Sequence, residues 1–189
     1  MNFANKISIF RILSVPFFIA SLIYYNPQKD YLRWISLAIF SLAVISDAVD
    51  GYIARKSRQI SKAGLILDPL ADKVLLMSAF ICLFLRQDLP HKIYFPLWVV
   101  LIVLSRDILI LLGAVVIFVV KKDISISATK WGKLTTIFQM FSVMGVLLQW
   151  HFSYFLWWLA VFFTLISGVD YLMRGFKILY APSESGNSH

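Results

Sequence analysis

The sequence predicts an all-α fold, a polytopic membrane helix bundle with about six transmembrane helices. Of its 189 residues, 60% are hydrophobic and 15% are charged, a balance that ordinary soluble domains do not show. Apolar runs long enough to cross a bilayer recur along the chain, separated by short polar connections. The basic residues gather on alternate connections, as in multi-span membrane proteins. These observations indicate a chain built to lie in hydrocarbon.

The first expected helix is Asn5–Tyr25, an apolar run that contains Arg11 and Pro16. A secretion signal is the alternative for such a segment. We prefer a retained helix, because Arg11 splits the apolar region and no cleavage site with small residues follows it. Pro16 is expected to kink this helix or to begin its fully helical part.

The remaining spans follow from the polar connections between them. Asn26–Asp30 carries a turn signal, Pro90 lies in a second connection, and Lys121–Lys133 is a basic stretch with serines. One membrane domain would cover residues 1–180, and the polar tail 181–189 is expected to be disordered. The expected helices are Tyr31–Ala54, Leu65–Leu85, Ile93–Val120, Leu134–Leu148 and Phe155–Leu172.

The basic residues set the expected orientation. One side of the membrane has only Lys29, Arg33, Arg86 and Lys92. The other side collects a larger set: Lys6, Arg11, Arg55, Lys56, Arg58, Lys62, Lys121, Lys122, Lys130, Lys133, Arg174 and Lys177. By the positive-inside rule, both termini and the stretch that carries Asp47, Asp50, Asp68 and Asp72 face the cytoplasm, in the cell inner membrane. This topology accounts for the net charge of +8 without nucleic acid, since no basic stripe with aromatic residues occurs in a polar domain. Tryptophans near helix ends are expected interfacial anchors: Trp34, Trp98, Trp150, Trp157 and Trp158.

Four aspartates stand out, because hydrocarbon does not tolerate unpaired carboxylates. Asp47 and Asp50 are three residues apart, and Asp68 and Asp72 are four apart, so on helices each pair shares one face. The pairs end one expected helix and begin the next, which allows them to converge on one side of the membrane. Clustered carboxylates without His or Cys favour Mg²⁺ or Mn²⁺.

Small residues lie beside these acidic faces at Gly51, Ala54 and Gly64. They let a bulky ligand approach the backbone, or they let membrane helices pack closely, and both interpretations stay open. Arg55 and Lys62 are candidates to meet phosphate charge. The alternative for Lys62 is a solvated loop cation.

This pattern resembles the signature of the CDP-alcohol phosphatidyltransferases. Upstream, Asn5-x2-Ser8-x2-Arg11 resembles the segment that closes the nucleotide site in that family, and an interfacial anchor is its alternative interpretation. Every fixed position of the main signature is present: Asp47-x2-Asp50-Gly51-x2-Ala54-Arg55-x8-Gly64-x3-Asp68-x3-Asp72.

The resemblance implies an enzyme that transfers a phosphatidyl group from CDP-diacylglycerol to an alcohol and releases CMP. It implies that Asp47, Asp50 and Asp68 bind a pair of Mg²⁺ or Mn²⁺ ions. Asp72 would complete that cluster and act as the general base. It further implies a CDP site, with these residues as candidates: Ser8, Gly51, Ala54, Arg55 and Gly64, then Asn5, Arg11 and Lys62.

The alcohol is less well defined by the sequence. Leu67–Lys73 resembles the subgroup that makes phosphatidylglycerophosphate or cardiolipin, and Arg106 and Lys133 suit an anionic acceptor such as glycerol 3-phosphate. An ion pair with a neighbouring carboxylate is the alternative for Arg106. Phosphatidylglycerophosphate synthases commonly show Glu at Asp107 and Lys at Thr135, where this chain fits the cardiolipin synthases better. Glycerol 3-phosphate is favoured, and phosphatidylglycerol is the second candidate.

Two other classes use carboxylates in a membrane. A prenyltransferase spaces its acidic motifs differently, and a non-enzymatic cation-binding protein such as a transporter has no reason for the small and basic pattern beside the aspartates. The family is often dimeric, so a homodimer is a candidate assembly alongside the substrates and the membrane lipids.

Overall fold

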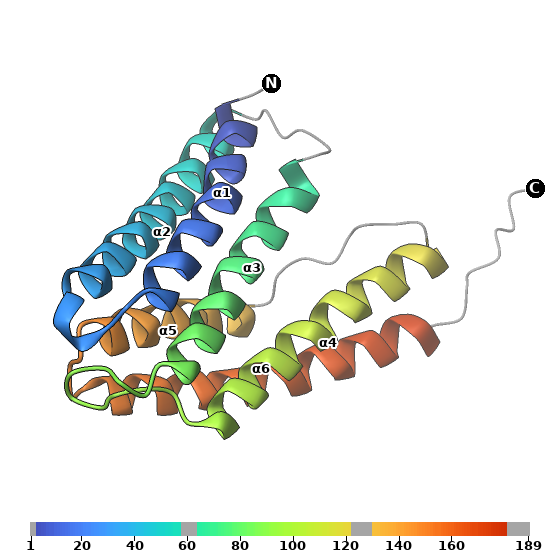
Figure 1. Cartoon of the computed structure of the whole chain (residues 1–189). Helices are drawn as coiled ribbons and strands as arrows, with labels where there is room; N and C mark the ends of the chain where they lie inside the picture. The colour runs from blue at the N-terminus through green and yellow to red at the C-terminus, as the bar shows by residue number, and fades with distance from the viewer. Residues whose placement is uncertain (1–2, 58–63, 122–129, 181–189) are drawn as a thin grey trace, which may run out of the picture.

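The computed structural model describes the backbone of residues 3–57, 64–121 and 130–180, and the side chains of residues 10–49, 73–113 and 130–174. Within these ranges the chain forms six α-helices, one 3₁₀ turn and no strand (Figure 1). The all-α prediction is therefore confirmed for this part of the chain. The tail 181–189, expected to be disordered, lies outside it.

Helices α1, α2 and α3 match the three apolar runs expected in the first half of the chain. They span Phe3–Ile23, Tyr31–Ser57 and Gly64–Leu85, and the 3₁₀ turn Pro27–Lys29 lies between the first two. Helix α1 is already helical before Pro16 and continues beyond it. Of the two alternatives expected for Pro16, a start of the helical part is therefore wrong, and a kink stays a prediction. Membrane helices tolerate such a residue because neighbouring groups satisfy the freed backbone.

Helices α4, α5 and α6 span Leu97–Lys121, Lys130–Leu147 and Ser153–Tyr180. Helix α4 begins later than the expected Ile93, because Pro96 keeps the residue before it out of the helical conformation. The carbonyl of this proline instead accepts the first backbone hydrogen bonds of α4. Helix α5 begins before its expected start, and α6 continues well past its expected end.

The six helices form two groups joined at one end of the molecule. Helix α1 packs against α2 and α3, α6 packs against α5 and α4, and α5 also contacts α2 and α3. The connections 24–30, 86–96 and 148–152 lie together at what we call the loop end (Figure 1). The opposite ends of the helices fan apart and form what we call the wide end. The last turns of α2 and the first turns of α3 and α5 lie there.

Large aromatic side chains fill the contacts between the helices. Phe18 of α1 meets Phe40 of α2 with ring centroids 5.8 Å apart, and Phe80 of α3 stacks on Phe95 at 4.4 Å. Trp157 is buried, and its ring centroid lies 5.9 Å from that of Phe95. Its expected role as an interfacial anchor is therefore wrong. The other tryptophans expected there are exposed: Trp34, Trp98, Trp150 and Trp158.

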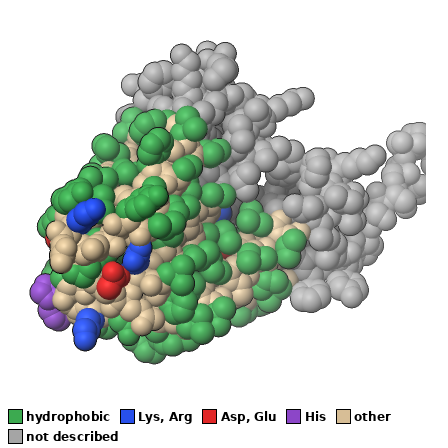
Figure 2. Space-filling model, in the orientation of Figure 1, with side chains coloured by type: hydrophobic (Ala, Val, Ile, Leu, Met, Phe, Trp, Pro, Cys, Tyr) green, Lys and Arg blue, Asp and Glu red, His purple; other side chains and the backbone are tan. Residues whose placement is uncertain are grey.

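The surface of the described part of the chain is largely apolar. Hydrophobic side chains cover most of the face seen in Figure 2, and most of the charged side chains and the histidines in view lie at the loop end. Two helical segments, Tyr31–Val49 and Ser153–Arg174, are long and apolar enough to cross a membrane. Shorter apolar segments, Phe10–Ile23 and Lys73–Leu85, lie in α1 and α3. The expectation of six spans stays a prediction.

Arginines close two helix termini at the loop end. Arg33 is buried and donates from Nη1 to the carbonyl of Leu147, the last residue of α5, at 2.5 Å. Its Nε and Nη2 donate to both carboxylate oxygens of Asp30, at 2.8 and 2.7 Å. Arg86 donates to the carbonyl of Ile23, at the end of α1. A cation suits these positions because the last carbonyls of a helix carry partial negative charge.

Gln149 joins two of the connections at the loop end. Its side-chain oxygen accepts the backbone N–H groups of His91 and Ile93, at 3.0 and 3.3 Å. Its side-chain nitrogen donates to the carbonyls of Ile93 and Val146, at 2.9 and 2.7 Å. The backbone of Gln149 has φ 53°, in the left-handed region, which turns the chain sharply between α5 and α6. The α3–α4 and α5–α6 connections are thus held as one unit.

Candidate active site

The structure places the four aspartates on helices, as expected. Asp47 and Asp50 lie in the second half of α2, and Asp68 and Asp72 lie in the first half of α3. Both segments belong to the wide end of the molecule (Figure 1). The helical spacing within each pair is therefore confirmed. The side chain of Asp47 is described, whereas those of the other three lie outside the described residues, so convergence of the two pairs stays a prediction.

Arg11 of α1 forms an ion pair with Asp47 of α2. Its Nη2 lies 2.7 Å from Oδ1 of the carboxylate. The arginine side chain is 2% exposed and the aspartate side chain 36%, so the pair has one buried and one accessible partner. A cation inside an apolar helix requires a countercharge of this kind. The contact brings the upstream motif and the first aspartate together, which spacing alone does not show.

A hollow of about 540 Å³ lies between α2 and α5. It is lined on one side by Asp47 with its neighbours on α2, and on the other by Lys133 and Thr136 of α5. The side chain of Lys133 is exposed. A candidate metal ligand and a candidate acceptor-binding residue therefore line the same hollow, although they are far apart in the sequence.

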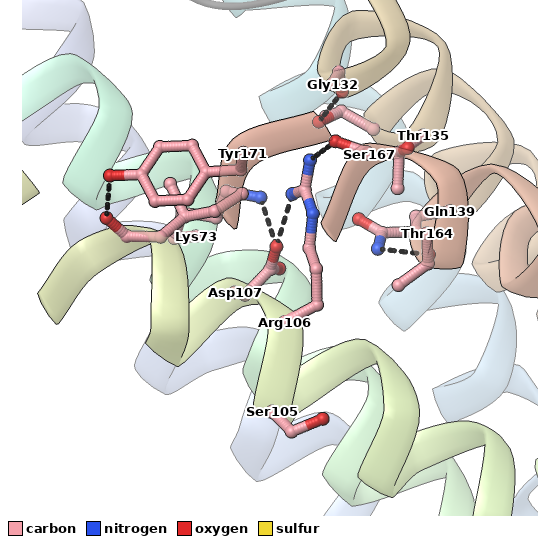
Figure 3. A network of polar contacts seen from close by, with 12 residues as sticks. Lys73, Ser105, Arg106, Asp107, Gly132, Thr135, Gln139, Thr164, Ser167 and Tyr171 are labelled. Carbon is pink, nitrogen blue, oxygen red and sulfur yellow. Dashed lines mark hydrogen bonds and ion pairs between the residues drawn. The ribbon is translucent and has the colours of Figure 1, made fainter. Parts of the chain in front are cut away.

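A buried polar network joins the helices α3, α4 and α6 (Figure 3). Asp107 of α4 is completely buried, and its Oδ1 accepts from Lys73 Nζ at 2.6 Å and from Arg106 Nη1 at 2.7 Å. Arg106 also donates from Nη2 to the hydroxyl of Ser167 on α6. The network thus ties α3 to α4 and α4 to α6. We call it the Asp107 network, formed by Lys73, Arg106, Asp107 and Ser167.

The Asp107 network bears on the expected role of Arg106. This side chain is 7% exposed, and it pairs with the adjacent carboxylate, which is the arrangement foreseen as its alternative role. Both terminal nitrogens of the guanidinium are used within the protein. An acceptor bound at this arginine would have to share it with Asp107. Lys133 is different, because its exposed side chain lines the hollow.

Two residues that depart from the phosphatidylglycerophosphate synthase pattern are both buried at helix contacts. Asp107 holds the network just described. Thr135 is also fully buried, and its hydroxyl oxygen lies 2.9 Å from the carbonyl oxygens of both Trp131 and Phe163, either of which can accept its one proton. These contacts show that position 135 faces α6 rather than the hollow.

Close packing of α4 and α6 extends the contact beside the network. Tyr171 of α6 donates its hydroxyl to the carbonyl of Ile110 at 3.0 Å. A Cβ at Gly113 would lie 2.8 Å from the tyrosine ring, so glycine is needed for the ring to lie against α4. On the other side of α6, Gln139 lies 3.5 Å from the hydroxyl of Thr164. Polar contacts therefore run from α3 across α4 and α6 to α5 (Figure 3).

Lys73 and Ser167 are the network members that the sequence analysis did not assign. Lys73 directly follows Asp72. A carboxylate partner for Lys73 could have been predicted on physical grounds. A lysine that is only partly exposed within a membrane helix needs a carboxylate nearby, and Asp107 is an acid in the middle of an apolar run. No sequence signal marks Ser167, whose role depends on how α6 packs.

The described part of the site supplies one ligand that suits a hard divalent cation. Asp47 offers a partly exposed carboxylate at the edge of the hollow, and carboxylate oxygen is the ligand that Mg²⁺ and Mn²⁺ prefer. Among the described side chains, no three His, Cys, Asp or Glu residues lie close enough together to hold a metal. The other three candidate ligands lie outside these side chains.

Comparison with known proteins decides the family. The family model for CDP-alcohol phosphatidyltransferase matches residues 1–166. The chain belongs to this family. The match covers both motifs that meet at Arg11 and Asp47, and it includes all six helices at least in part.

Relatives of similar length carry specific names. The chain is 30% identical over 190 residues to the CDP-diacylglycerol–glycerol-3-phosphate 3-phosphatidyltransferase of Aquifex aeolicus, with 95% of this chain and 99% of that protein covered. It is 29% identical over 195 residues to the protein of the same name from Bacillus subtilis, covering 94% and 97%. It is also 32% identical over 183 residues to a probable phosphatidylglycerophosphate synthase of Mycobacterium tuberculosis, covering 93% and 82%.

Proposed function

We propose that this protein transfers the phosphatidyl group of CDP-diacylglycerol to glycerol 3-phosphate, giving phosphatidylglycerophosphate and CMP. The observation that carries the proposal is the alignment, over nearly the whole chain, with relatives named for this reaction. The ion pair between Arg11 and Asp47 supports it, because it joins the two segments that carry the family motifs.

In the proposed reaction, the terminal hydroxyl oxygen of the acceptor attacks the phosphorus of the phosphatidyl group. The bond between this phosphorus and the oxygen that bridges to CMP breaks, and CMP leaves with the electron pair. Asp72 takes the hydroxyl proton, a task that requires reach to the acceptor more than an unusual pKa. Holding the two substrates in line supplies much of the rate.

The carboxylates of Asp47, Asp50, Asp68 and Asp72 would hold Mg²⁺ or Mn²⁺. Such ions neutralise the diphosphate and stabilise the leaving oxygen when bound. Around them, the small residues Gly51, Ala54 and Gly64 would let the nucleotide approach the helices, with Ser8 and Arg55 as polar contacts. These assignments follow the family motif at positions that this chain matches. Asn5, Arg11 and Lys62 are further candidates for the same nucleotide site.

The acceptor phosphate would bind at Lys133. Arg106, which belongs to the Asp107 network, is the second candidate to contact this phosphate. Lys133 supports this choice because it lines the hollow that also contains Asp47. The electrostatic attraction between an ammonium group and a phosphate is strong where water is scarce. In this role, Arg106 would meet the acceptor only by sharing its guanidinium with Asp107.

We further propose that the helices form six membrane spans in the cell inner membrane, with the wide end facing the cytoplasm. The distribution of basic residues supports this orientation. The loop end carries the four basic residues that fall on the side opposite to the cytoplasm by the positive-inside rule: Lys29, Arg33, Arg86 and Lys92. The acyl chains of the donor would then stay in the bilayer while its nucleotide reaches the aspartates from the cytoplasm.

The function is tested with purified protein and CDP-diacylglycerol, reading CMP release and the lipid product. Glycerol 3-phosphate, phosphatidylglycerol, inositol phosphate and serine are supplied in turn. We expect turnover with glycerol 3-phosphate alone. Turnover with phosphatidylglycerol instead would identify a cardiolipin synthase, and turnover with neither would overturn the proposal.

Metal dependence is tested in the same assay. Excess EDTA is expected to abolish CMP release, and added Mg²⁺ or Mn²⁺ is expected to restore it. Undiminished turnover in EDTA would contradict the metal assignment without affecting the choice of acceptor.

A further inference from the structure

Two histidines lie side by side at the loop end of the molecule. His91 belongs to the α3–α4 connection and His151 to the α5–α6 connection, and their ring centroids are 6.0 Å apart. Both residues are exposed, and the histidine side chains in Figure 2 lie together at the surface. Neither imidazole takes part in the bridge made by Gln149 or in the proposed reaction.

Hydrogen bonds fix the backbone beside both histidines. The backbone N–H of His91 donates to the side-chain oxygen of Gln149 at 3.0 Å, and this glutamine lies just before His151 in the chain. The carbonyl of His151 accepts from the N–H of Tyr154 at 3.4 Å, at the start of α6. One glutamine thus holds both connections, so a ligand shared by the two imidazoles would not have to bring them together.

The separation of the two rings suits one metal ion between them. Zn²⁺ lies about 2.0–2.1 Å from a coordinating imidazole nitrogen, which puts the metal roughly 3 Å from each ring centroid and the two centroids roughly 5–6 Å apart. The observed 6.0 Å lies at the upper end of this range, so a small rotation of exposed side chains completes the geometry. Neutral imidazole is a ligand that suits zinc, copper and nickel.

The charges nearby favour such metals over hard cations. Lys92 follows His91 and is exposed, and Asp88, the one acid of the α3–α4 connection, pairs with Arg86 at 3.6 Å. Mg²⁺ and Ca²⁺ prefer carboxylate and other oxygen ligands. Among the described side chains, no third His, Cys, Asp or Glu joins the histidine pair to form a metal-binding group. Water would therefore fill the remaining positions of a bound metal.

We propose that His91 and His151 together bind one transition-metal ion of the zinc class, which joins the α3–α4 connection to the α5–α6 connection. Each imidazole donates the lone pair of one ring nitrogen. The ion binds the folded arrangement, in which the two connections lie together, so it stabilises the fold by mass action. This site is separate from the aspartates of the wide end, and it does not rest on the proposed function.

The test uses untagged protein in detergent, because a histidine tag would bind the same metals. Excess Mg²⁺ is present throughout to occupy the carboxylates. His91→Ala and His151→Ala each remove one proposed ligand. The matched control is His189→Ala, which removes the third histidine of the chain.

Saturating Zn²⁺ is expected to raise the midpoint of thermal unfolding by about 4 °C in the original chain and in His189→Ala, and by less than about 1 °C in the other two variants. In titration calorimetry, the original chain is expected to bind one Zn²⁺ more than either of those variants. An equal rise in all four proteins would overturn the proposal. The same number of bound ions in the original chain and in a folded His151→Ala variant would also overturn it.

A second measurement uses His189→Ala, which keeps every described residue, so it does not depend on a substitution within the fold. One equivalent of Cu²⁺ is added, and pulsed electron paramagnetic resonance counts the imidazoles bound to the ion. Two coordinated imidazoles are expected, and a spectrum with one or none would overturn the proposal. CMP release with glycerol 3-phosphate is expected to be equal in His91→Ala and the original chain, so the metal site and the proposed reaction can fail separately.

Discussion

The two ends of the molecule use charged and amide side chains in different ways. At the loop end, Arg33 satisfies both oxygens of Asp30 and closes α5, and Gln149 forms four hydrogen bonds to backbone groups. At the wide end, Asp47 pairs with Arg11 yet remains partly exposed to a hollow. The loop end is therefore built for cohesion, and the wide end keeps a carboxylate accessible.

The Asp107 network lies between these extremes. It is buried like the contacts of the loop end, but it holds Lys73, the residue after the proposed base, and Arg106, a candidate acceptor residue. Removing side chains at the three places should therefore separate activity from stability. Substitutions at the wide end should reduce activity alone, and substitutions at the loop end should reduce stability alone. Substitutions in the Asp107 network should reduce both.

The largest effect is expected from Asp72→Asn. The substitution keeps the size of the side chain but removes the proposed proton acceptor, so kcat is expected to fall about 10²–10⁴-fold. Thermal unfolding in detergent is expected to be nearly unchanged. Full CMP release by this variant would contradict the role of Asp72 as the base, whatever the outcome for donor binding.

Asp107→Asn is expected to reduce both properties. Two cations would lose a buried carboxylate, and breaking a buried ion pair costs about 3–5 kcal/mol of unfolding free energy. Activity is also expected to fall, with a larger change in KM for glycerol 3-phosphate than for the donor.

Asp107→Glu is the matched control, because it keeps the charge. We expect it to restore most of the activity. Equal losses in the Glu and Asn variants would show that the carboxylate must also keep its position, so that charge alone does not account for the role of the network.

Gln149→Asn is expected to affect stability alone. Asparagine tolerates the left-handed backbone at this position, but its shorter side chain does not reach Ile93 and His91. Leaving buried backbone groups unpaired costs about 1–3 kcal/mol each. Denaturation should therefore occur earlier while kcat/KM stays close to the original value. A selective loss of kcat/KM without destabilisation would contradict the separation of the two ends.

The smallest effect concerns the pH dependence of stability at the loop end. Hydrogen bonds from Arg33 lower the pKa of Asp30 below its ordinary value of 3.8. The stability that this pair contributes is fully present above the ordinary value, and it is lost as the pH falls through the lowered value. Stability measured from pH 6 to pH 2 is expected to decline less steeply in Asp30→Asn than in the original chain. If stability declines equally with pH in both proteins, Asp30 does not contribute to the loss of stability in acid.

The sequence predicts the helical elements well, because long apolar runs leave little choice of secondary structure. The differences arise at proline and at helix ends. Pro96 delays the start of α4, α1 passes through Pro16, and Trp157 turns inward although its position in the sequence suggests an interface. Such details depend on which neighbouring helix is present, which periodicity does not show.

The candidate site divides in the same way. The aspartate motif identifies the donor half, because its fixed spacing places carboxylates on helix faces. The pairing of Arg11 with Asp47 requires α1 to pack on α2, and the pairing of Lys73 with Asp107, 34 residues away, requires α3 to pack on α4. Neither pairing has a local signature. Every buried charge must have a partner. This rule reduces the number of candidate partners for Arg11 and Lys73, but it does not identify which one is used.

The bridge made by Gln149 has a consequence for the order of events during synthesis. Its partner His91 precedes it by 58 residues, and ribosomes add roughly 5–20 residues per second, so about 3–12 s pass between the two. During this interval the α3–α4 connection has been made but lacks the residue that joins it to the next turn. The contact between the two connections is therefore missing while the first four helices are made, and the loop end closes only when the hairpin of α5 and α6 has been added.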